Sequence, residues 1–213
     1  LHAPSPKQKP TFMYFPGLPD SPVFERSLFP WFERLESQYA DIRAEAQSVL
    51  DAQNGLSPFL SLGEKDRAGD YLGGERPNWD AYFFYQHGEK YTEQHAACPK
   101  AATALESLPL VRIAEHAPEI FFSVLTAGTH ILPHYGTTNT RSVVHLPLIV
   151  PAGCALKVLD RVIPGKAGEC FAFDDTYLHE AWNRGTGTRV ILLMDTWNPH
   201  LSEVEKLALA EVV

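Results

Sequence analysis

Two histidines in the second half of the chain follow apolar runs and begin polar loops. His134 lies in PHYG after the run THIL, and His179 lies in DDTYLHE after the run FAF. Non-haem iron(II) oxygenases bind their metal through two His and one carboxylate. We interpret His134 and His179 as residues from separate sheets that converge on one metal ion. Gly136 stands where a His-x-Asp or His-x-Glu motif would place the carboxylate. A purely structural role is the alternative for both histidines.

Arg189 begins the strongly apolar run RVILLMD. Because an unpaired buried charge is costly, its guanidinium needs an anionic partner. A carboxylate fits the fork of N–H donors that a guanidinium presents. An acidic co-substrate beside the metal would supply that carboxylate. A salt bridge with Asp174, Asp175 or Asp195 is the alternative, and the residues alone leave both open.

Polar side chains also recur on the run RSVVHLPLI. Arg141, Val143 and His145 alternate along it and would share one face of a strand. Ser123 lies on the preceding apolar run, FFSVL, where its hydroxyl could donate a hydrogen bond. Polar groups on the inner face of an apolar strand are unusual unless they bind something, because burying them without a partner is unfavourable. We therefore predict that this face lines a binding site.

Short strands are the elements that must position these residues. From residue 120 onward, apolar runs alternate with Gly, Pro, Asn and Asp, which is typical of strands joined by tight turns. This spacing predicts a mainly β protein with flanking helices, whose core over 120–200 is a two-sheet jelly roll. The predicted strands are FFSVL, SVVHLPLIV, ALKVLD, ECFAFD and RVILLMDTW.

The rest of the chain mixes helical and irregular patterns. Residues 1–10 are expected to form a flexible lead-in, and residues 11–213 a single domain whose part 11–119 is helical or irregular. Ser202 and Glu205 have the spacing of a capping box, which predicts a closing helix over 202–213. Further predicted elements are strands over 11–15 and 81–85, helices over 29–50 and 99–108, and a long irregular segment over 53–78.

Composition narrows the classes of partner. The chain has 213 residues and a formal net charge of −8, and it has no cluster of Lys and Arg. These features argue against nucleic acid and against an anionic membrane surface as partners. No apolar stretch reaches the length of a membrane span. The three cysteines lack CxxC spacing, which favours free thiols and a cytoplasmic location over a disulfide frame or a zinc site.

The motifs together resemble one enzyme family. GTHILPHYGTTNTR followed by VVHLPL, then FAFDDTYLHEAWN and TRVILLMDTWNP, are similar to segments of the aspartyl/asparaginyl β-hydroxylases. PTFMYFPGLP, WDAYFFYQHG and CPKAATALESLP also match the family's catalytic domain in order, so the resemblance covers nearly the whole chain. It implies a cupin-like double-stranded β-helix and an Fe(II)- and 2-oxoglutarate-dependent dioxygenase. Such enzymes hydroxylate the β-carbon of aspartyl or asparaginyl side chains.

The resemblance also implies roles for individual residues. Family members bind iron through two His and have a Gly in place of the carboxylate, so His134 and His179 would be the ligands and Gly136 the vacated position, filled by water. Arg189 and Ser123 would bind the distal carboxylate of 2-oxoglutarate, and His145 the end nearer the metal. Molecular oxygen is the second co-substrate. The expected substrate is an Asp- or Asn-containing peptide, a carrier-bound residue or a free amino acid.

One position departs from the family pattern. The family commonly has Arg where this chain has Val143, two residues before His145. Arg141, on the same predicted face, is expected to take over part of the co-substrate binding. Arg67 and Arg76, in the irregular segment, are candidates for substrate binding, although solvated loop charges are the commoner alternative.

Two other functions stay open beside the dioxygenase. The replacement of the family's Arg by Val143 favours a non-catalytic β-barrel module that binds a small dicarboxylic acid through Arg189. A cupin-like metalloenzyme that does not use 2-oxoglutarate is the other alternative. The presence of both histidines together with Arg189 favours the dioxygenase over the binding module.

Overall fold

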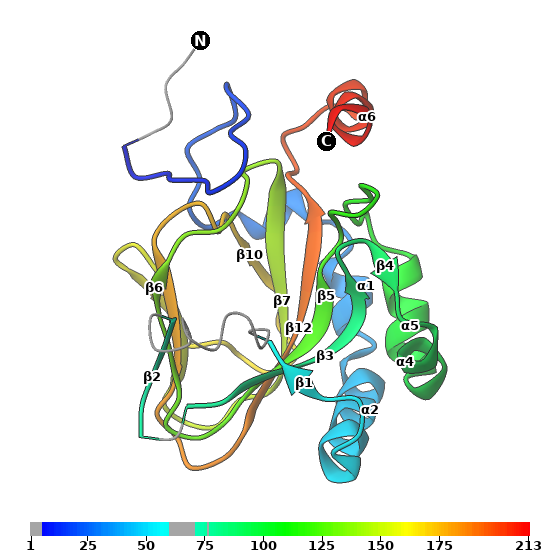
Figure 1. Ribbon diagram of the computed structural model, residues 1–213, viewed down its shortest axis with the longest axis vertical. Helices are drawn as coiled ribbons and strands as arrows, with labels where there is room; N and C mark the ends of the chain where they lie inside the picture. Colours follow the sequence, from blue (N-terminus) through cyan, green and yellow to red (C-terminus); the bar gives the residue numbers. More distant parts are fainter. Residues whose placement is uncertain (1–5, 60–70, 76) are drawn as a thin grey trace.

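Two antiparallel sheets face each other across the centre of the molecule (Figure 1). The structure is a computed structural model that describes residues 6–59, 71–75 and 77–213. Within these residues the larger sheet has the strand order β1-β3-β5-β12-β7-β10, with β4 paired to β3. The smaller sheet has the order β2-β6-β11-β8-β9. This arrangement is the predicted double-stranded β-helix with flanking helices.

The elements have the following bounds. The strands of the larger sheet are β1 (Ser57–Pro58), β3 (Trp79–Gln86), β4 (Glu89–Lys90), β5 (Ile120–Leu125), β7 (Arg141–Ile149), β10 (Phe171–Phe173) and β12 (Arg189–Trp197). The strands of the smaller sheet are β2 (Leu72–Gly73), β6 (His130–His134), β8 (Cys154–Val158), β9 (Arg161–Ile163) and β11 (His179–Asn183). The helices are η1 (Arg26–Leu28), α1 (Phe32–Glu36), α2 (Tyr39–Ala52), α4 (Thr92–Ala97), α5 (Pro99–Glu106) and α6 (Glu203–Val212).

Strand alternation gives the larger sheet two different faces. On β7, Val144, Leu146 and Leu148 belong to the main apolar cluster, which also contains buried residues of α1, α2 and α5. The intervening Val143 and His145 face the other way and line an internal cavity between the sheets. The helices thus cover the outer face (Figure 1), and the inner face is left for binding.

Several predicted elements are confirmed, and one helix is divided. The strands predicted from residue 120 onward, the strand over 81–85 and the helix over 99–108 correspond to β5, β7, β8, β10, β12, β3 and α5. Ser202 and Glu205 form the predicted capping box of α6. The helix predicted over 29–50 is two helices, α1 and α2, because the chain turns at Ser37 and Gln38.

The N-terminal segment differs from its prediction. Residues 11–15 form no strand, and only Met13 makes a β-bridge, with Thr138. The backbone N–H of Thr11 donates instead to the carbonyl of Gly136 at 2.9 Å, and that of Lys9 donates to Thr176 at 2.8 Å. The backbone of the segment is therefore hydrogen-bonded to two loops, one after β6 and one before β11.

The described part of the lead-in is also anchored. Gln8 is 7% exposed, and its amide donates to the Asp174 carboxylate at 3.0 Å and to the Thr176 hydroxyl at 3.3 Å. The expectation of a flexible lead-in is therefore wrong for residues 6–10, because a buried, hydrogen-bonded side chain holds them to the domain.

The cysteines and the lengths of the helices also bear on expectations from the composition. Cys98, Cys154 and Cys170 are buried free thiols, as predicted. Each helix formed by the described residues is too short or too polar to traverse a bilayer.

His95 on α4 is a buried histidine outside the candidate site. Its ring packs edge-on against Phe84 and Tyr85, with centroids 5.5 and 5.0 Å away, and both ring nitrogens lack hydrogen-bond partners within the described structure. Burial lowers the pKa of His95, and the nearby Lys90 charge lowers it further. The folded protein therefore binds this proton less readily than the unfolded chain, so stability falls as the pH drops below about 6.5.

We expect His95→Leu to raise the free energy of unfolding, by about 1 kcal/mol at pH 8, because it removes an unsatisfied buried polar group. The gain should be larger at pH 5, where the unfolded chain of the parent protein takes up the proton. Urea denaturation at the two pH values measures both effects. His116→Leu, at an exposed position, is the matched control, and an equal gain at both pH values would contradict the proposed origin.

Candidate active site

His134 and His179 lie side by side. His134 ends β6, His179 begins β11, and the two residues are direct cross-strand partners with ring centroids 4.1 Å apart. The expectation that they come from separate sheets is wrong, because β6 and β11 are neighbouring strands of the smaller sheet. Antiparallel pairing brings the end of one strand beside the start of the other, so both imidazoles reach the same end of the cavity.

The hydrogen bonds of both rings select one tautomer. Nδ1 of His134 is 2.7 Å from the carbonyl oxygen of Leu132, and Nδ1 of His179 is 2.9 Å from that of Tyr177. A carbonyl oxygen can only accept, so each Nδ1 carries the proton and each Nε2 keeps a lone pair. Metal-binding histidines usually have their second nitrogen held in this way. The pair is therefore prepared to bind a cation through Nε2.

Both imidazoles are neutral near pH 7. Burial lowers the pKa of His134. Burial, and then the neighbouring His134, lower the pKa of His179 to about 4. A neutral imidazole is the form that binds a metal, so burial favours the ligand form.

Gly136 is packed under a carboxylate. A Cβ built on Gly136 would lie 2.0 Å from Cγ and from Oδ2 of Asp175. The Gly136 N–H also donates to the Asp175 carbonyl at 2.6 Å. The space for a side chain two residues after His134 is thus filled by an acid from the loop before β11. From the sequence, Asp175 is predicted only as a possible ion-pair partner of Arg189, although the pair Asp174-Asp175 close to His179 is a signal for a role at the site.

The Asp175 carboxylate is only partly satisfied. Oδ2 accepts from Arg141 at 3.0 Å, whereas Oδ1 is buried and has no hydrogen-bond partner in the part of the chain described. The two Nε2 atoms of the neutral rings could bind a metal ion, and Oδ1 of Asp175 could accept a hydrogen bond from a water ligand of that ion. Among the described residues, no group of three or more His, Cys, Asp or Glu side chains is placed to hold a metal directly. A metal ion at this candidate centre would meet the two imidazoles as ligands.

We expect Gly136→Ala to weaken metal binding and to cost about 1–3 kcal/mol of stability, because a methyl group there must displace Asp175. Metal titration and thermal unfolding measure the two effects. Gly187→Ala is the control, since its nearest contact would be a Pro151 ring atom at 3.3 Å. A Gly136→Ala protein with unchanged metal affinity would show that Asp175 does not support the centre.

Arg189 is buried and unpaired. The residue is 4% exposed and lines the cavity, and its guanidinium makes no hydrogen bond or ion pair with any residue that the structure describes. Burial lowers its pKa to about 10, so it remains charged at neutral pH. The alternative of a protein salt bridge is not found, since Asp175 and Asp195 pair with Arg141, and Asp174 accepts from Gln8 and Thr176. An unpaired buried cation in a cavity is suited to an anionic ligand.

Ser123 and His145 lie on the strands that flank β12. The Ser123 hydroxyl accepts from Trp79 Nε1 at 3.0 Å and keeps its own proton for donation. His145 is 5% exposed, and neither of its ring nitrogens has a partner among the described residues. Burial, and then the nearby charge of Arg189, lower its pKa well below the usual value. Two polar groups thus face the cavity with capacity to bind a ligand.

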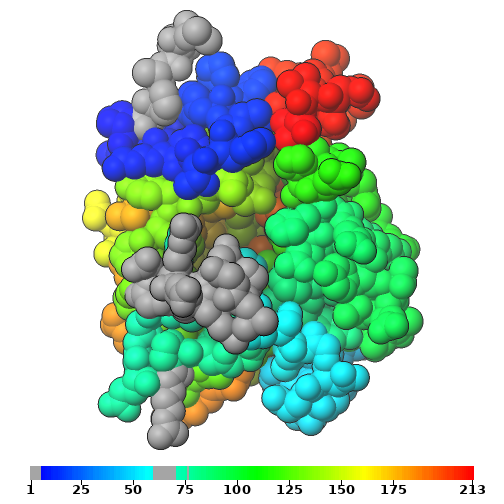
Figure 2. Space-filling model, in the orientation of Figure 1, coloured from blue at the N-terminus to red at the C-terminus, as the bar shows by residue number. Residues whose placement is uncertain are grey.

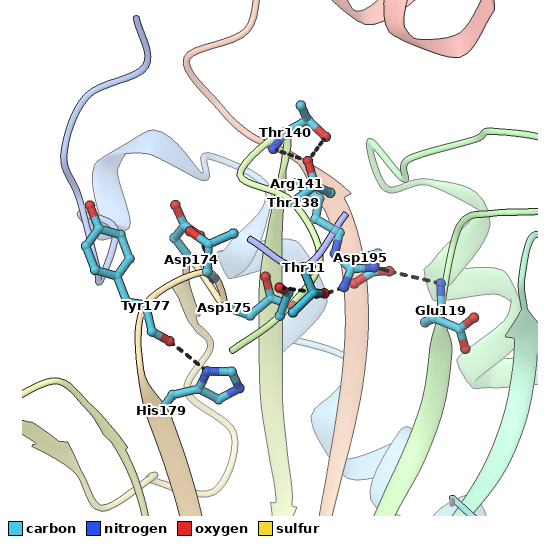
Figure 3. Close-up of polar contacts among 12 residues, drawn as sticks. Thr11, Glu119, Thr138, Thr140, Arg141, Asp174, Asp175, Tyr177, His179 and Asp195 are labelled. Atoms are coloured by element: carbon cyan, nitrogen blue, oxygen red, sulfur yellow. Dashed lines mark hydrogen bonds and ion pairs between the residues drawn. The ribbon is translucent and has the colours of Figure 1, made fainter. Parts of the chain in front are cut away.

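Arg141 has a different environment from the one expected. Its Nη1 is 2.7 Å from Asp195 and its Nη2 is 3.0 Å from Asp175 (Figure 3). Burial alone would lower the pKa of Arg141, but the two aspartates raise it. Two protein carboxylates already hold the guanidinium, so co-substrate binding by Arg141 remains a prediction without support from this geometry. Arg67 and Arg76 lie outside the described residues.

One cavity of about 270 Å³ connects these side chains. Its walls are mainly apolar, and Figure 2 shows a hollow on this face, bordered above by the N-terminal segment in blue. Trp79 is part of the wall and stacks on Phe59 with centroids 4.0 Å apart. The structure thus brings His134, His179, Ser123, His145 and Arg189 together around one space, as predicted.

Known proteins resemble this chain in sequence. The family model described as aspartyl/asparaginyl beta-hydroxylase matches residues 36–199. The human aspartyl/asparaginyl beta-hydroxylase is 29% identical over 210 residues, covering 89% of this chain and 26% of that protein. The ornithine lipid ester-linked acyl 2-hydroxylase of Rhizobium tropici is 33% identical over 187 residues, covering 85% of this chain and 62% of that protein. The chain thus spans only part of these relatives.

A solved structure resembles it in fold. A prolyl hydroxylase from Trichoplax adhaerens, in complex with a hypoxia inducible factor peptide fragment, aligns with a TM-score of 0.50 and 12% identity. The alignment covers 87% of this chain and 97% of that one. At this identity the likeness concerns the fold, which is the double-stranded β-helix seen here. The family match extends over most of the chain, including both histidines and Arg189. By this match, the chain belongs to the aspartyl/asparaginyl β-hydroxylase family.

Proposed function

We propose that the protein is an Fe(II)- and 2-oxoglutarate-dependent dioxygenase. In this proposal it hydroxylates the β-carbon of an aspartyl or asparaginyl residue in a peptide, on a carrier or as a free amino acid. One observation supports it most directly. Two neutral imidazoles with free Nε2 atoms share a cavity with a buried guanidinium that has no partner among the described residues. A metal and a dicarboxylate would satisfy these groups together.

Each residue has a defined role in this proposal. His134 and His179 would hold Fe(II) through Nε2, and the Asp175 carboxylate would accept hydrogen bonds from water on the metal. Arg189 and Ser123 would bind the distal carboxylate of 2-oxoglutarate, and His145 would donate to the carboxylate nearer the metal. When bound, Fe(II) supplies the redox chemistry by which dioxygen and 2-oxoglutarate oxidise a C–H bond to C–OH, with succinate and carbon dioxide released. The apolar walls keep bulk water from this space.

The decisive experiment couples two products. The protein is incubated with Fe(II), 2-oxoglutarate and oxygen against Asp- and Asn-containing peptides and amino acids. Succinate and a substrate mass gain of one oxygen atom should appear in equal amounts. Turnover that does not need 2-oxoglutarate would instead indicate the cupin-like metalloenzyme. Binding of 2-oxoglutarate without succinate in the presence of every substrate would indicate the non-catalytic module.

An acyl chain is a second candidate substrate for the same reaction. The lining of the cavity is mainly apolar, and Phe59, Trp79 and Phe121 form a ring cluster on its wall, with the Phe59 and Phe121 centroids 5.0 Å apart. One relative is named for hydroxylating the acyl chain of an ornithine lipid. Mass spectrometry of lipid extracts treated with the enzyme tests this candidate.

The free thiols support a cytoplasmic location, which remains a proposal.

A further inference from the structure

The cavity has opposite charges at its two ends. Arg189, Leu193 and Asp195 alternate on β12 and all line it. Arg189 and Asp195 are six positions apart on the strand, a distance of about 20 Å in an extended chain. The guanidinium that would hold the co-substrate therefore lies at one end, and a carboxyl group lies at the other.

Two further acids accompany Asp195. The Asp195 N–H donates to the carbonyl of Glu119 at 3.2 Å, and the Glu119 N–H donates to the Asp195 carboxylate at 3.1 Å. Asp175 approaches from the loop that joins β10 to β11 and shares Arg141 with Asp195 (Figure 3). All three acids line the cavity. We call Glu119, Asp175 and Asp195, with Arg141 between the aspartates, the acidic end.

The acidic end has no free cation in the described structure. Arg141 is the one cation lining it there, and its charge is shared by two aspartates at 2.7 and 3.0 Å. Val143, directly opposite Asp195, is 4% exposed and contributes no charge. When both aspartates are ionised, they carry more charge than Arg141 neutralises. The Glu119 carboxylate adds less to the excess, because it accepts from the His87 N–H at 2.7 Å and lies 2.9 Å from His87 Nδ1. A substrate carboxylate entering here would meet like charge at short range.

Unsatisfied atoms at the same end indicate what would fit. Asp175 is 6% exposed, lines the cavity, and its Oδ1 has no donor among the described residues, so its two lone pairs can accept from water on the metal and from one further donor. Nε of Arg141 has no acceptor there. One group therefore needs a hydrogen-bond donor and its neighbour needs an acceptor. A carboxamide offers both without a charge, whereas a carboxylate offers only acceptors and an ammonium only donors.

We propose that the acidic end recognises a carboxamide on the substrate and disfavours a carboxylate, so that an asparaginyl side chain is accepted and an aspartyl one is rejected. This inference rests on the proposed function and narrows its substrate. Specificity then comes from like-charge repulsion against the competitor as much as from contacts to the accepted group.

Oxygen-free titrations test the two proposals separately. Formation of the visible absorption band of the Fe(II)-2-oxoglutarate complex tests the proposed function, and a protein that forms no band refutes both proposals at that first step. Three blocked amino acids of similar size are then added to the loaded protein, namely N-acetyl amides of asparagine, aspartate and 2,4-diaminobutyrate. We expect the asparagine probe to shift the band with at least about tenfold higher affinity than the aspartate probe.

Several results would overturn the carboxamide assignment while the proposed function stands. These are equal or tighter binding of the aspartate probe, tighter binding of the ammonium probe, or no response to any probe from a protein that shows the band. Asp195→Asn keeps the shape of the side chain and removes one charge, so it should bring the two affinities close together. Thermal unfolding checks that this variant folds, and Glu119→Gln gives a second test with the same expected direction.

Discussion

Replacing His179 or His134 with alanine is expected to abolish metal binding and turnover. Each change removes an Nε2 ligand whose tautomer is held by a backbone carbonyl. With only two protein ligands, the loss should exceed the roughly 10- to 100-fold effect of losing an outer-sphere partner. Calorimetric titration with Mn(II) or Fe(II) without oxygen measures the affinity, and succinate release measures turnover.

His130→Ala is the matched control. His130 lies on the same strand as His134, but its Nε2 is 2.8 Å from a carboxylate oxygen of Glu180, and it does not line the cavity. Metal affinity should be unchanged in this variant. An equal loss in His130→Ala, or metal binding retained in His179→Ala, would contradict the assignment of the ligands.

Arg189→Leu is expected to change affinity and stability in opposite directions. The affinity for 2-oxoglutarate should fall at least about 100-fold, since charge-assisted hydrogen bonds to the distal carboxylate are lost. The ligand-free protein should become more stable, by on the order of 1 kcal/mol, because a buried charge without a described partner is removed. Titration of the Fe(II)-2-oxoglutarate band and thermal unfolding of the ligand-free protein measure the two effects.

Arg184→Leu serves as the comparison. Arg184 lies close to Arg189 in sequence but is exposed, with its guanidinium carbon 4.5 Å from the Trp182 ring centroid. Its removal should leave the affinity for 2-oxoglutarate unchanged. If Arg189→Leu lowered stability and kept the affinity for 2-oxoglutarate, Arg189 would be a structural residue instead.

The contrast between Arg141 and Arg189 shows how burial and pairing separate two similar residues. Both line the same cavity, but Arg141 is held by Asp175 and Asp195, whereas Arg189 meets no carboxylate in the described structure. A paired guanidinium organises the wall of a site, and an unpaired one attracts a ligand. The structure therefore leaves the guanidinium of Arg189 open to a ligand, as the prediction for Arg189 requires, and it does not support the additional role expected for Arg141.

Local patterns predict most strands of the two-sheet core, the cap of the last helix and the polar residues that share the cavity, but not β6 and β11. Turn residues and alternation are local signals, so β5, β7 and β12 and the inner positions of Ser123 and His145 could be predicted from them. The break between α1 and α2 was missed, because the apolar period continues across it.

The pairing and register of these strands follow from tertiary packing and could not be predicted from the sequence. The register that places His134 beside His179 in one sheet depends on pairing between segments far apart in the chain. The packing of Asp175 over Gly136 and the sharing of Arg141 by two aspartates depend on contacts between loops and strands that are far apart in the chain. Local sequence patterns do not predict such long-range contacts, because several pairing registers of the strands would bury the same apolar residues. The partner of a buried charge is therefore settled by packing.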